Sequence, residues 1–291
     1  MNPVDLIGRF EERKFPEFRA PTIDTLRWGS KRHHVPILLE VDVTEARIAI
    51  HAQKKMGQRI GFTGWMVKCI AQAVSEHKSI QALRQGNQRL IIFEDVDVAI
   101  LVERAVGEDE MLPMPCIIRK ANVKSVATIQ AEIQAAQQQP IDAETVQLSA
   151  SRKSWLMKLY TRLPKGVRDV FFWQPLFRNP FLVKQKIGTI GVTVIGMSGQ
   201  HGMSWGIPIG IHPLVVAVGA IAKRPGVVED HIAIREYVGM TVLFDHDVTD
   251  GAPVARFIRR LQEVILEGYE LRDSDRMEQQ LENDNQGSSD D

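Results

Sequence analysis

Short apolar runs alternate with longer segments of helical periodicity along this chain of 291 residues. Apolar runs with the length and composition of buried strands lie at 35–43, 90–93, 96–102, 187–195, 214–221 and 238–244. Apolar residues at helical spacing mark the segments 44–56, 63–77 and 123–137 and the segment that follows Pro253. Strands interleaved with helices in this way predict an α/β fold in which a mixed sheet is flanked by helices.

Composition and charge are those of a globular protein with a substantial core. Hydrophobic residues make up 44% of the chain, and Lys plus Arg equal Asp plus Glu at 36 each, so no global field favours a nucleic-acid partner. Cys69 and Cys116 lie in apolar segments, which suits buried thiols in a reducing compartment. The N-terminus lacks a signal-peptide pattern and no apolar run reaches membrane-spanning length. We therefore expect a cytoplasmic protein that does not bind nucleic acid.

The stretch His246-Asp247-Val248-Thr249-Asp250-Gly251 is the strongest candidate for a catalytic motif. It follows the apolar run at 240–244 and precedes an amphipathic helix that we expect Pro253 to open at its first position. A connection between a strand and a helix can hold an imidazole at a cleft, with a backbone carbonyl bonded to one ring nitrogen and the other left as a base. A solvated loop histidine is the competing interpretation, and the motif alone does not decide between the two.

The segment 244–257 resembles the C-terminal signature of the acyltransferase components of 2-oxo acid dehydrogenase complexes, and chloramphenicol acetyltransferase shares its core motif. Further matches follow in order at 30–44, 67–74, 96–100, 115–119 and 217–225. The resemblance spans about residues 20 to 270 and implies a chloramphenicol acetyltransferase-like sandwich. Fewer than about thirty residues precede the first match, so we expect a stand-alone member without a lipoyl domain.

The resemblance assigns roles to three residues. Acyl transfer needs a base to take the proton of the acceptor, because a thiol with a pKa near about 8.5 is mostly protonated at neutral pH, and His246 fits that role. Thr193 matches a hydroxyl residue that stabilises the tetrahedral oxyanion, and it lies 53 positions before His246. Asp250 matches a carboxylate that braces the histidine loop through an ion pair with an arginine. Either Arg27 or Arg32 is the expected partner, and the sequence leaves the choice open.

The resemblance also implies the substrates and the assembly. Coenzyme A would serve as a substrate, and a lipoyl group carried by another protein is a second acyl carrier. The acceptor would be a thiol, a hydroxyl or an amine, and no metal is implied. Family members complete the histidine's channel with residues of a neighbouring subunit, which predicts a homotrimer. A non-catalytic trimeric scaffold of the same fold is the alternative. The joint presence of His246, Asp250 and Thr193 favours catalysis, because a scaffold does not need these residues together.

Residues 151–186 form an insert where the family has a short connection. One predicted helical face carries Trp155, Leu156, Leu159 and Leu163, and the opposite side carries Arg152, Lys153, Lys158 and Arg162. The insert would either pack between subunits, cover an apolar channel beside Thr193 or lie on an anionic membrane surface. The channel would be lined by Trp155, Phe171, Phe172, Trp173 or Phe177 and would favour acyl groups bulkier than acetyl. Prolines at 164, 175 and 180 exclude one continuous helix.

These patterns divide the chain into three parts. Residues 1–20 form an N-terminal extension and residues 21–272 form the acyltransferase domain with its insert. The segment 273–291 is rich in Asp, Asn, Gln, Ser and Glu, a composition that buries too little apolar surface to fold, so we expect a disordered acidic tail.

Overall fold

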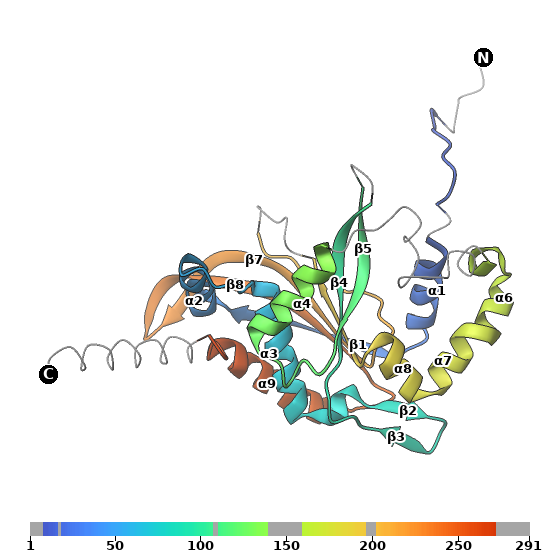
Figure 1. Cartoon of the computed structure of the whole chain (residues 1–291). Helices are drawn as coiled ribbons and strands as arrows, with labels where there is room; N and C mark the ends of the chain where they lie inside the picture. Colours follow the sequence, from blue (N-terminus) through green and yellow to red (C-terminus); the bar gives the residue numbers. More distant parts are fainter. Residues whose placement is uncertain (1–7, 17–18, 107–109, 139–158, 196–201, 272–291) are drawn as a thin grey trace, which may run out of the picture.

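A computed structural model describes residues 8–16, 19–106, 110–138, 159–195 and 202–271 (Figure 1). In this part of the chain, six strands form one sheet in the order β1–β8–β7–β6–β4–β5. Their bounds are His34–Asp42 (β1), Val98–Val106 (β4), Glu110–Ile118 (β5), Ile190–Val194 (β6), Leu214–Val228 (β7) and His231–Asp245 (β8). β6 runs parallel to β4 and β7, and the other neighbouring strands are antiparallel. The sheet is therefore mixed, as the sequence predicts.

Helices cover one face of this sheet and enclose the core (Figure 1). They are α2 (Thr44–Lys55), α3 (Phe62–Glu76), α4 (Val126–Gln138) and α9 (Gly251–Leu266). Alternate residues of β8, from Val238 to Phe244, face these helices because successive side chains of a strand point to opposite faces. Trp65 of α3 and Phe257 of α9 are fully buried in this layer. The prediction of an α/β sandwich with a mixed sheet flanked by helices is confirmed.

β7 and β8 continue well beyond the runs that the sequence marks as strands. Residues 223–228 and 231–236 pair only with each other in the described sheet, and they form a ribbon that extends away from its body (Figure 1). Glu229 and Asp230 turn the ribbon with φ values of 48° and 63°. Near this turn Val227, Ile232 and Ile234 are 75%, 81% and 78% exposed. The apolar signal is interrupted here by charged residues and a proline, so apolar periodicity alone places the strand ends too early.

The described part of the insert is helical in three pieces. A short helix ends at residue 162, and α6 (Lys165–Arg168), the π-helical turn η2 (Asp169–Trp173) and α7 (Gln174–Arg178) follow without a break. α8 (Pro180–Ile187) begins after Asn179, whose Oδ1 accepts hydrogen bonds from the N–H groups of Phe181 and Leu182. Breaks at Pro164 and Pro180 agree with the sequence prediction. At Pro175 the helix continues, because the wider π-helical turn just before it accommodates the missing N–H.

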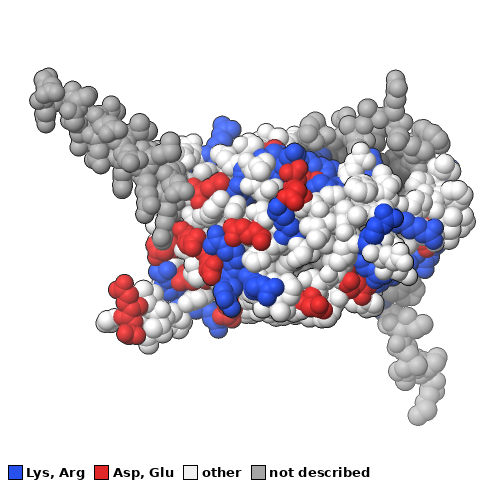
Figure 2. Space-filling model, turned by 90° about the horizontal axis from the view of Figure 1, so that it is seen from below, with Lys and Arg blue, Asp and Glu red and all other residues white. Residues whose placement is uncertain are grey.

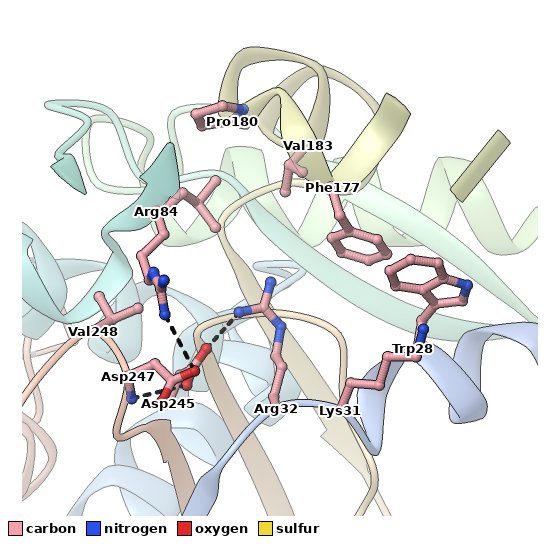
Figure 3. A pocket seen from close by; sticks show the side chains of 11 residues that line it. Trp28, Lys31, Arg32, Arg84, Phe177, Pro180, Val183, Asp245, Asp247 and Val248 are labelled. Carbon is pink, nitrogen blue, oxygen red and sulfur yellow. Dashed lines mark hydrogen bonds and ion pairs between the residues drawn. The ribbon is translucent and has the colours of Figure 1, made fainter. Parts of the chain in front are cut away.

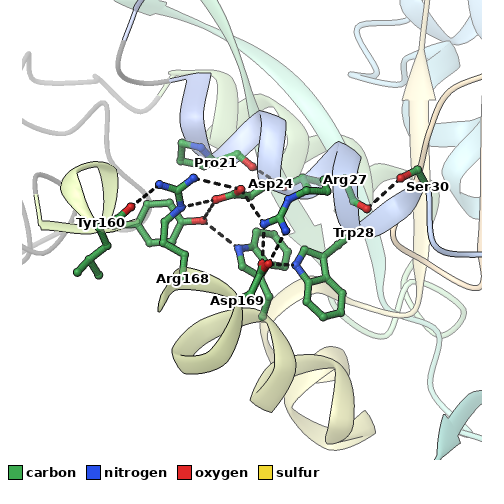
Figure 4. A network of polar contacts seen from close by, with 11 residues as sticks. Pro21, Asp24, Arg27, Trp28, Ser30, Tyr160, Arg168 and Asp169 are labelled. Carbon is green, nitrogen blue, oxygen red and sulfur yellow. Dashed lines mark hydrogen bonds and ion pairs between the residues drawn. The ribbon is translucent and has the colours of Figure 1, made fainter. Parts of the chain in front are cut away.

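A buried polar network joins the insert to α1 (Arg19–Gly29), as Figure 4 shows. The side chain of Asp24 is 1% exposed and accepts hydrogen bonds from Tyr160 Oη at 2.6 Å, Arg168 Nε at 2.7 Å and Arg27 Nη2 at 2.9 Å. Asp169 accepts hydrogen bonds from Trp28 Nε1 at 2.9 Å and from Arg27. Burial opposes ionisation of Asp24, but these hydrogen bonds lower its pKa, and burial beside Asp24 raises the pKa of Tyr160 to about 12. The insert is therefore fixed against α1 by charge-assisted hydrogen bonds.

Basic and acidic side chains are intermixed on the face of the molecule that Figure 2 shows. Among the described helices, none is both long enough and apolar enough to cross a membrane. The predicted basic helical face at Arg152, Lys153 and Lys158 lies outside the described residues, as does the predicted acidic tail.

Candidate active site

The His246 loop joins the end of β8 at Asp245 to the start of α9 at Gly251. The backbone N–H of His246 donates to the carbonyl of His33 at 3.0 Å, and its exposed ring lies 5.7 Å from the ring of Phe244. The expected position between a strand and a helix is confirmed, although Pro253 is the third helical residue and not the first. None of the described residues offers a backbone carbonyl to either ring nitrogen, so none of them fixes the tautomer of the imidazole.

Two carboxylates flank His246, and both are held by basic groups from elsewhere in the chain. Asp245 is buried and pairs with Arg32 at 2.5 Å between Oδ2 and Nη1, and its other oxygen accepts the N–H of Asp247 at 3.2 Å. Asp247 bonds to His33 Nδ1 at 2.9 Å and lies 3.6 Å from Arg84 Nη1. The hydrogen bond lowers the pKa of Asp247 and raises that of His33. The backbone on both sides of His246 is thereby anchored.

The ion pair expected between Asp250 and an arginine is wrong for both candidates. Arg32 pairs with Asp245, whereas Arg27 pairs with Asp24 and Asp169. Asp250 is exposed at the N-cap of α9, and its carboxylate makes no capping hydrogen bond. The reason is topological. His34 of β1 pairs with Asp245 of β8, which brings Arg32 beside Asp245, while the following turn carries Asp250 away.

Thr193 lies on β6, two strands away from β8. It is half-buried and opposite Ala217 of β7, which in turn is opposite Thr241 of β8. With strands about 4.8 Å apart and a rise of about 3.3 Å per residue, this register places the backbones of Thr193 and His246 about 20 Å apart. A single protomer therefore does not bring these two predicted site residues together.

Two other histidines lie behind the loop, His212 buried and His34 half-buried. His212 Nε2 donates to the carbonyl of Ile187 at 3.1 Å, and His34 Nε2 bonds to the carbonyl of His212 at 2.9 Å. Burial lowers the pKa of His212 to about 4 and also lowers that of His34. Both rings are neutral at pH 7, so they act as hydrogen-bond donors that join β1, α8 and the segment before β7.

A cavity of about 200 Å³ lies beside the His246 loop, between α1, the insert and β2 (Leu83–Gln85), as Figure 3 shows. Its lining consists of Trp28, Lys31, Arg32, Leu83, Arg84, Phe177, Pro180, Val183, Asp245, Asp247 and Val248. The sequence alone gives no role to Arg84. This residue lies on β2, which forms a short hairpin with β3 (Arg89–Ile91), and nothing in the local sequence distinguishes it from a solvent-exposed arginine.

The cavity corrects the expected channel beside Thr193. Phe177 lines the cavity, but it does so next to Asp245 and Asp247, and Thr193 is not part of the lining. Trp173 stacks on Trp28, whereas Phe171 and Phe172 are exposed. Trp155 lies outside the described residues. No group of three or more metal-ligating His, Cys, Asp or Glu side chains is present in the described ranges.

The chain matches the family model for the catalytic domain of 2-oxoacid dehydrogenases acyltransferase over residues 10–148 and 184–271. It belongs to this family. The match omits residues 149–183, the stretch in which the sequence places an insert. Among similar proteins, the lipoamide acyltransferase component of the branched-chain alpha-keto acid dehydrogenase complex of Bacillus subtilis is 26% identical over 80% of this chain and 46% of its own length. The chain thus spans about half the length of the curated relatives it matches.

Solved structures show the same fold. The dihydrolipoamide acetyltransferase of Azotobacter vinelandii superposes with a TM-score of 0.64 at 19% identity, covering 93% of this chain and 98% of that one. A probable dihydrolipoamide acetyltransferase of Listeria monocytogenes gives a TM-score of 0.61 at 20% identity, with 89% and 95% covered. These likenesses confirm the architecture that the sequence resemblance implies.

Proposed function

We propose that this chain is an acyltransferase that moves an acyl group between coenzyme A and an acceptor, with His246 as the general base. The observation that carries the proposal is the exposed imidazole of His246 on a loop whose backbone and two flanking carboxylates are anchored. The family match over residues 184–271 includes this loop. Relatives named as lipoamide and dihydrolipoyllysine acyltransferase components support a lipoyl group on another protein as the second carrier.

In this mechanism, a ring nitrogen of His246 takes the proton of the attacking thiol, whose sulfur bonds to the thioester carbonyl carbon. The hydroxyl of Thr193 donates a hydrogen bond to the oxyanion that forms. The C–S bond to the leaving thiol then breaks, and His246 returns the proton to that sulfur. The Azotobacter vinelandii enzyme supports this assignment, since a serine, a histidine and an asparagine have been investigated in its catalytic mechanism at nearly the same spacings as Thr193, His246 and Asp250.

The separation of about 20 Å within one protomer implies that Thr193 and His246 meet across an interface between copies. We infer a homotrimer in which each site takes its histidine from one protomer and its hydroxyl from the next. The β7–β8 ribbon supports assembly, because an isolated two-stranded ribbon is marginally stable and its exposed Val227, Ile232 and Ile234 need a partner surface. The structural likeness to the cubic core of a pyruvate dehydrogenase complex is in line with assembly.

A thioester exchange assay between coenzyme A carriers tests the proposal. His246→Ala should lower turnover by at least about 10²-fold while circular dichroism and the molar mass stay unchanged. His51→Ala is the matched control, since His51 is an exposed helical histidine on α2. Unchanged turnover in His246→Ala would refute the assignment, whereas no turnover in the wild type would favour the scaffold alternative.

Mixing two inactive variants tests the shared site. Equal amounts of His246→Ala and Thr193→Val protomers, reassembled together, should recover about one quarter of wild-type activity, because about one interface in four then pairs an intact histidine with an intact hydroxyl. No recovery in mixed oligomers would contradict a site built across the interface.

A further inference from the structure

The cavity beside the His246 loop has no role in the reaction proposed above. One of its walls is apolar and is built by the stacked rings of Trp28 and Phe177, whose centroids lie 5.2 Å apart, together with Pro180 and Val183. Phe177, Pro180 and Val183 fall in the stretch that the family model does not match. This wall is therefore a feature of the insert of this chain.

Three cationic side chains also line the cavity, and the Arg32 guanidinium carbon lies 5.7 Å from the centre of the Phe177 ring. Arg32 uses Nη1 to bind Asp245, and its Nε and Nη2 donate to none of the residues that the structure describes. Arg84 approaches from β2, and Figure 3 shows both guanidinium groups turned toward the cavity. Lys31 adds a third positive charge, with its Nζ 3.6 Å from the centre of the Trp28 ring. The cavity thus has three cationic side chains and only two carboxylates, those of Asp245 and Asp247. The planar guanidinium of Arg32, with two donor nitrogens free, matches the geometry of a carboxylate.

We propose that this cavity binds a small monocarboxylate with an apolar body. The carboxylate lies on the free donors of Arg32 and on Arg84, and the apolar body packs against Trp28 and Phe177. The volume of about 200 Å³ is below the range of roughly 300–1,000 Å³ typical of pockets for drug-sized ligands, so the ligand is a short acid or a single ring. A carboxylate bound there competes with Asp245 and Asp247 for the same arginines. The cavity is thereby coupled to the placement of His246.

Calorimetric titration of the full chain with benzoate and hexanoate tests the site without any activity assay. Benzamide, which has the shape of benzoate but no charge, should bind at least tenfold more weakly. Arg84→Met should weaken benzoate binding at least tenfold, and Phe177→Ala should weaken hexanoate binding. Arg89→Met is the matched control, since Arg89 is exposed on the paired strand β3, outside the cavity lining. Equal binding of benzamide, unchanged binding by Arg84→Met, or no detectable binding of either acid up to about 10 mM would overturn the proposal.

The coupling to His246 rests on the proposed acyltransferase function and has its own test. Saturating benzoate should lower kcat in the exchange assay at least twofold without raising the KM for the thioester. The effect should be reduced in Phe177→Ala, which loses the ligand's apolar contact. If benzoate binds and leaves kcat unchanged, the coupling is wrong and the binding site stands. If the chain binds benzoate but transfers no acyl group, the proposed function fails alone.

Discussion

Acidification from pH 7 to pH 5 should destabilise this protein through His212. The ring is buried and donates one hydrogen bond, from Nε2 to the carbonyl of Ile187. Its Nδ1 faces Gly191 closely enough that a Cβ there would lie 2.7 Å from it. Burial is the main cause that lowers its pKa to about 4, and the charge of Arg32 acts in the same direction. A second proton would give the ring a positive charge, and no carboxylate among the described residues pairs with it.

The pKa values set the size and the sign of the effect. The unfolded chain binds a proton at His212 below its ordinary pKa of 6.5, whereas the folded protein does so only below about 4. The neutral ring thus favours folding above pH 6.5, and this contribution is lost as the pH falls from 6.5 toward 4. At about 1.36 kcal/mol per pKa unit the full loss is about 3 kcal/mol, of which about 2 kcal/mol is lost by pH 5.

Urea unfolding followed by tryptophan fluorescence at pH 7 and at pH 5 measures this loss, at one fixed protein concentration. His212→Gln keeps a donor near the carbonyl of Ile187 but cannot titrate. The wild type should therefore lose about 2 kcal/mol more than this variant on acidification. His51→Gln, at an exposed position of α2, should behave like the wild type. Equal pH dependence in the wild type and His212→Gln would refute the reasoning.

Asp24→Asn should lower the free energy of unfolding by about 3 kcal/mol, because it removes the buried carboxylate that pairs with the half-buried Arg168 and Arg27, and limited proteolysis should then cleave within the insert; unchanged resistance would contradict the role of this network. Ile232→Ser combined with Ile234→Ser should lower the molar mass measured by light scattering while circular dichroism is retained; an unchanged mass would argue against the ribbon as an assembly surface. Gly191→Ala should lower the free energy of unfolding by about 1–3 kcal/mol, because its added Cβ would overpack the site. Gly166→Ala should leave this free energy unchanged, because its added Cβ would meet no atom within 4 Å. Equal urea midpoints for the two variants would contradict this prediction.

Local periodicity determined most of the secondary structure of this protein. The strand β1 and the helices α2, α3 and α9 lie within one or two residues of the runs that predict them, because each signal is contained in about 10–18 residues. The motif around His246 also placed that residue between a strand and a helix, since the apolar run before it and the amphipathic pattern after it are adjacent in the chain. The family follows from the order of such short motifs.

Only the tertiary structure decided which side chains meet. Arg32 and Asp245 are 213 positions apart, and Arg27 and Asp169 are 142 positions apart, so no local pattern could have selected either pair. Strand pairing places β1 against the end of β8 and thereby gives Arg32 to Asp245 instead of Asp250. The same sheet order separates Thr193 from His246 and leaves the insert to pack on α1. These contacts join residues that are far apart in the sequence. They depend on the register of the strands and on which side chains become buried, and both are settled only when the whole chain folds.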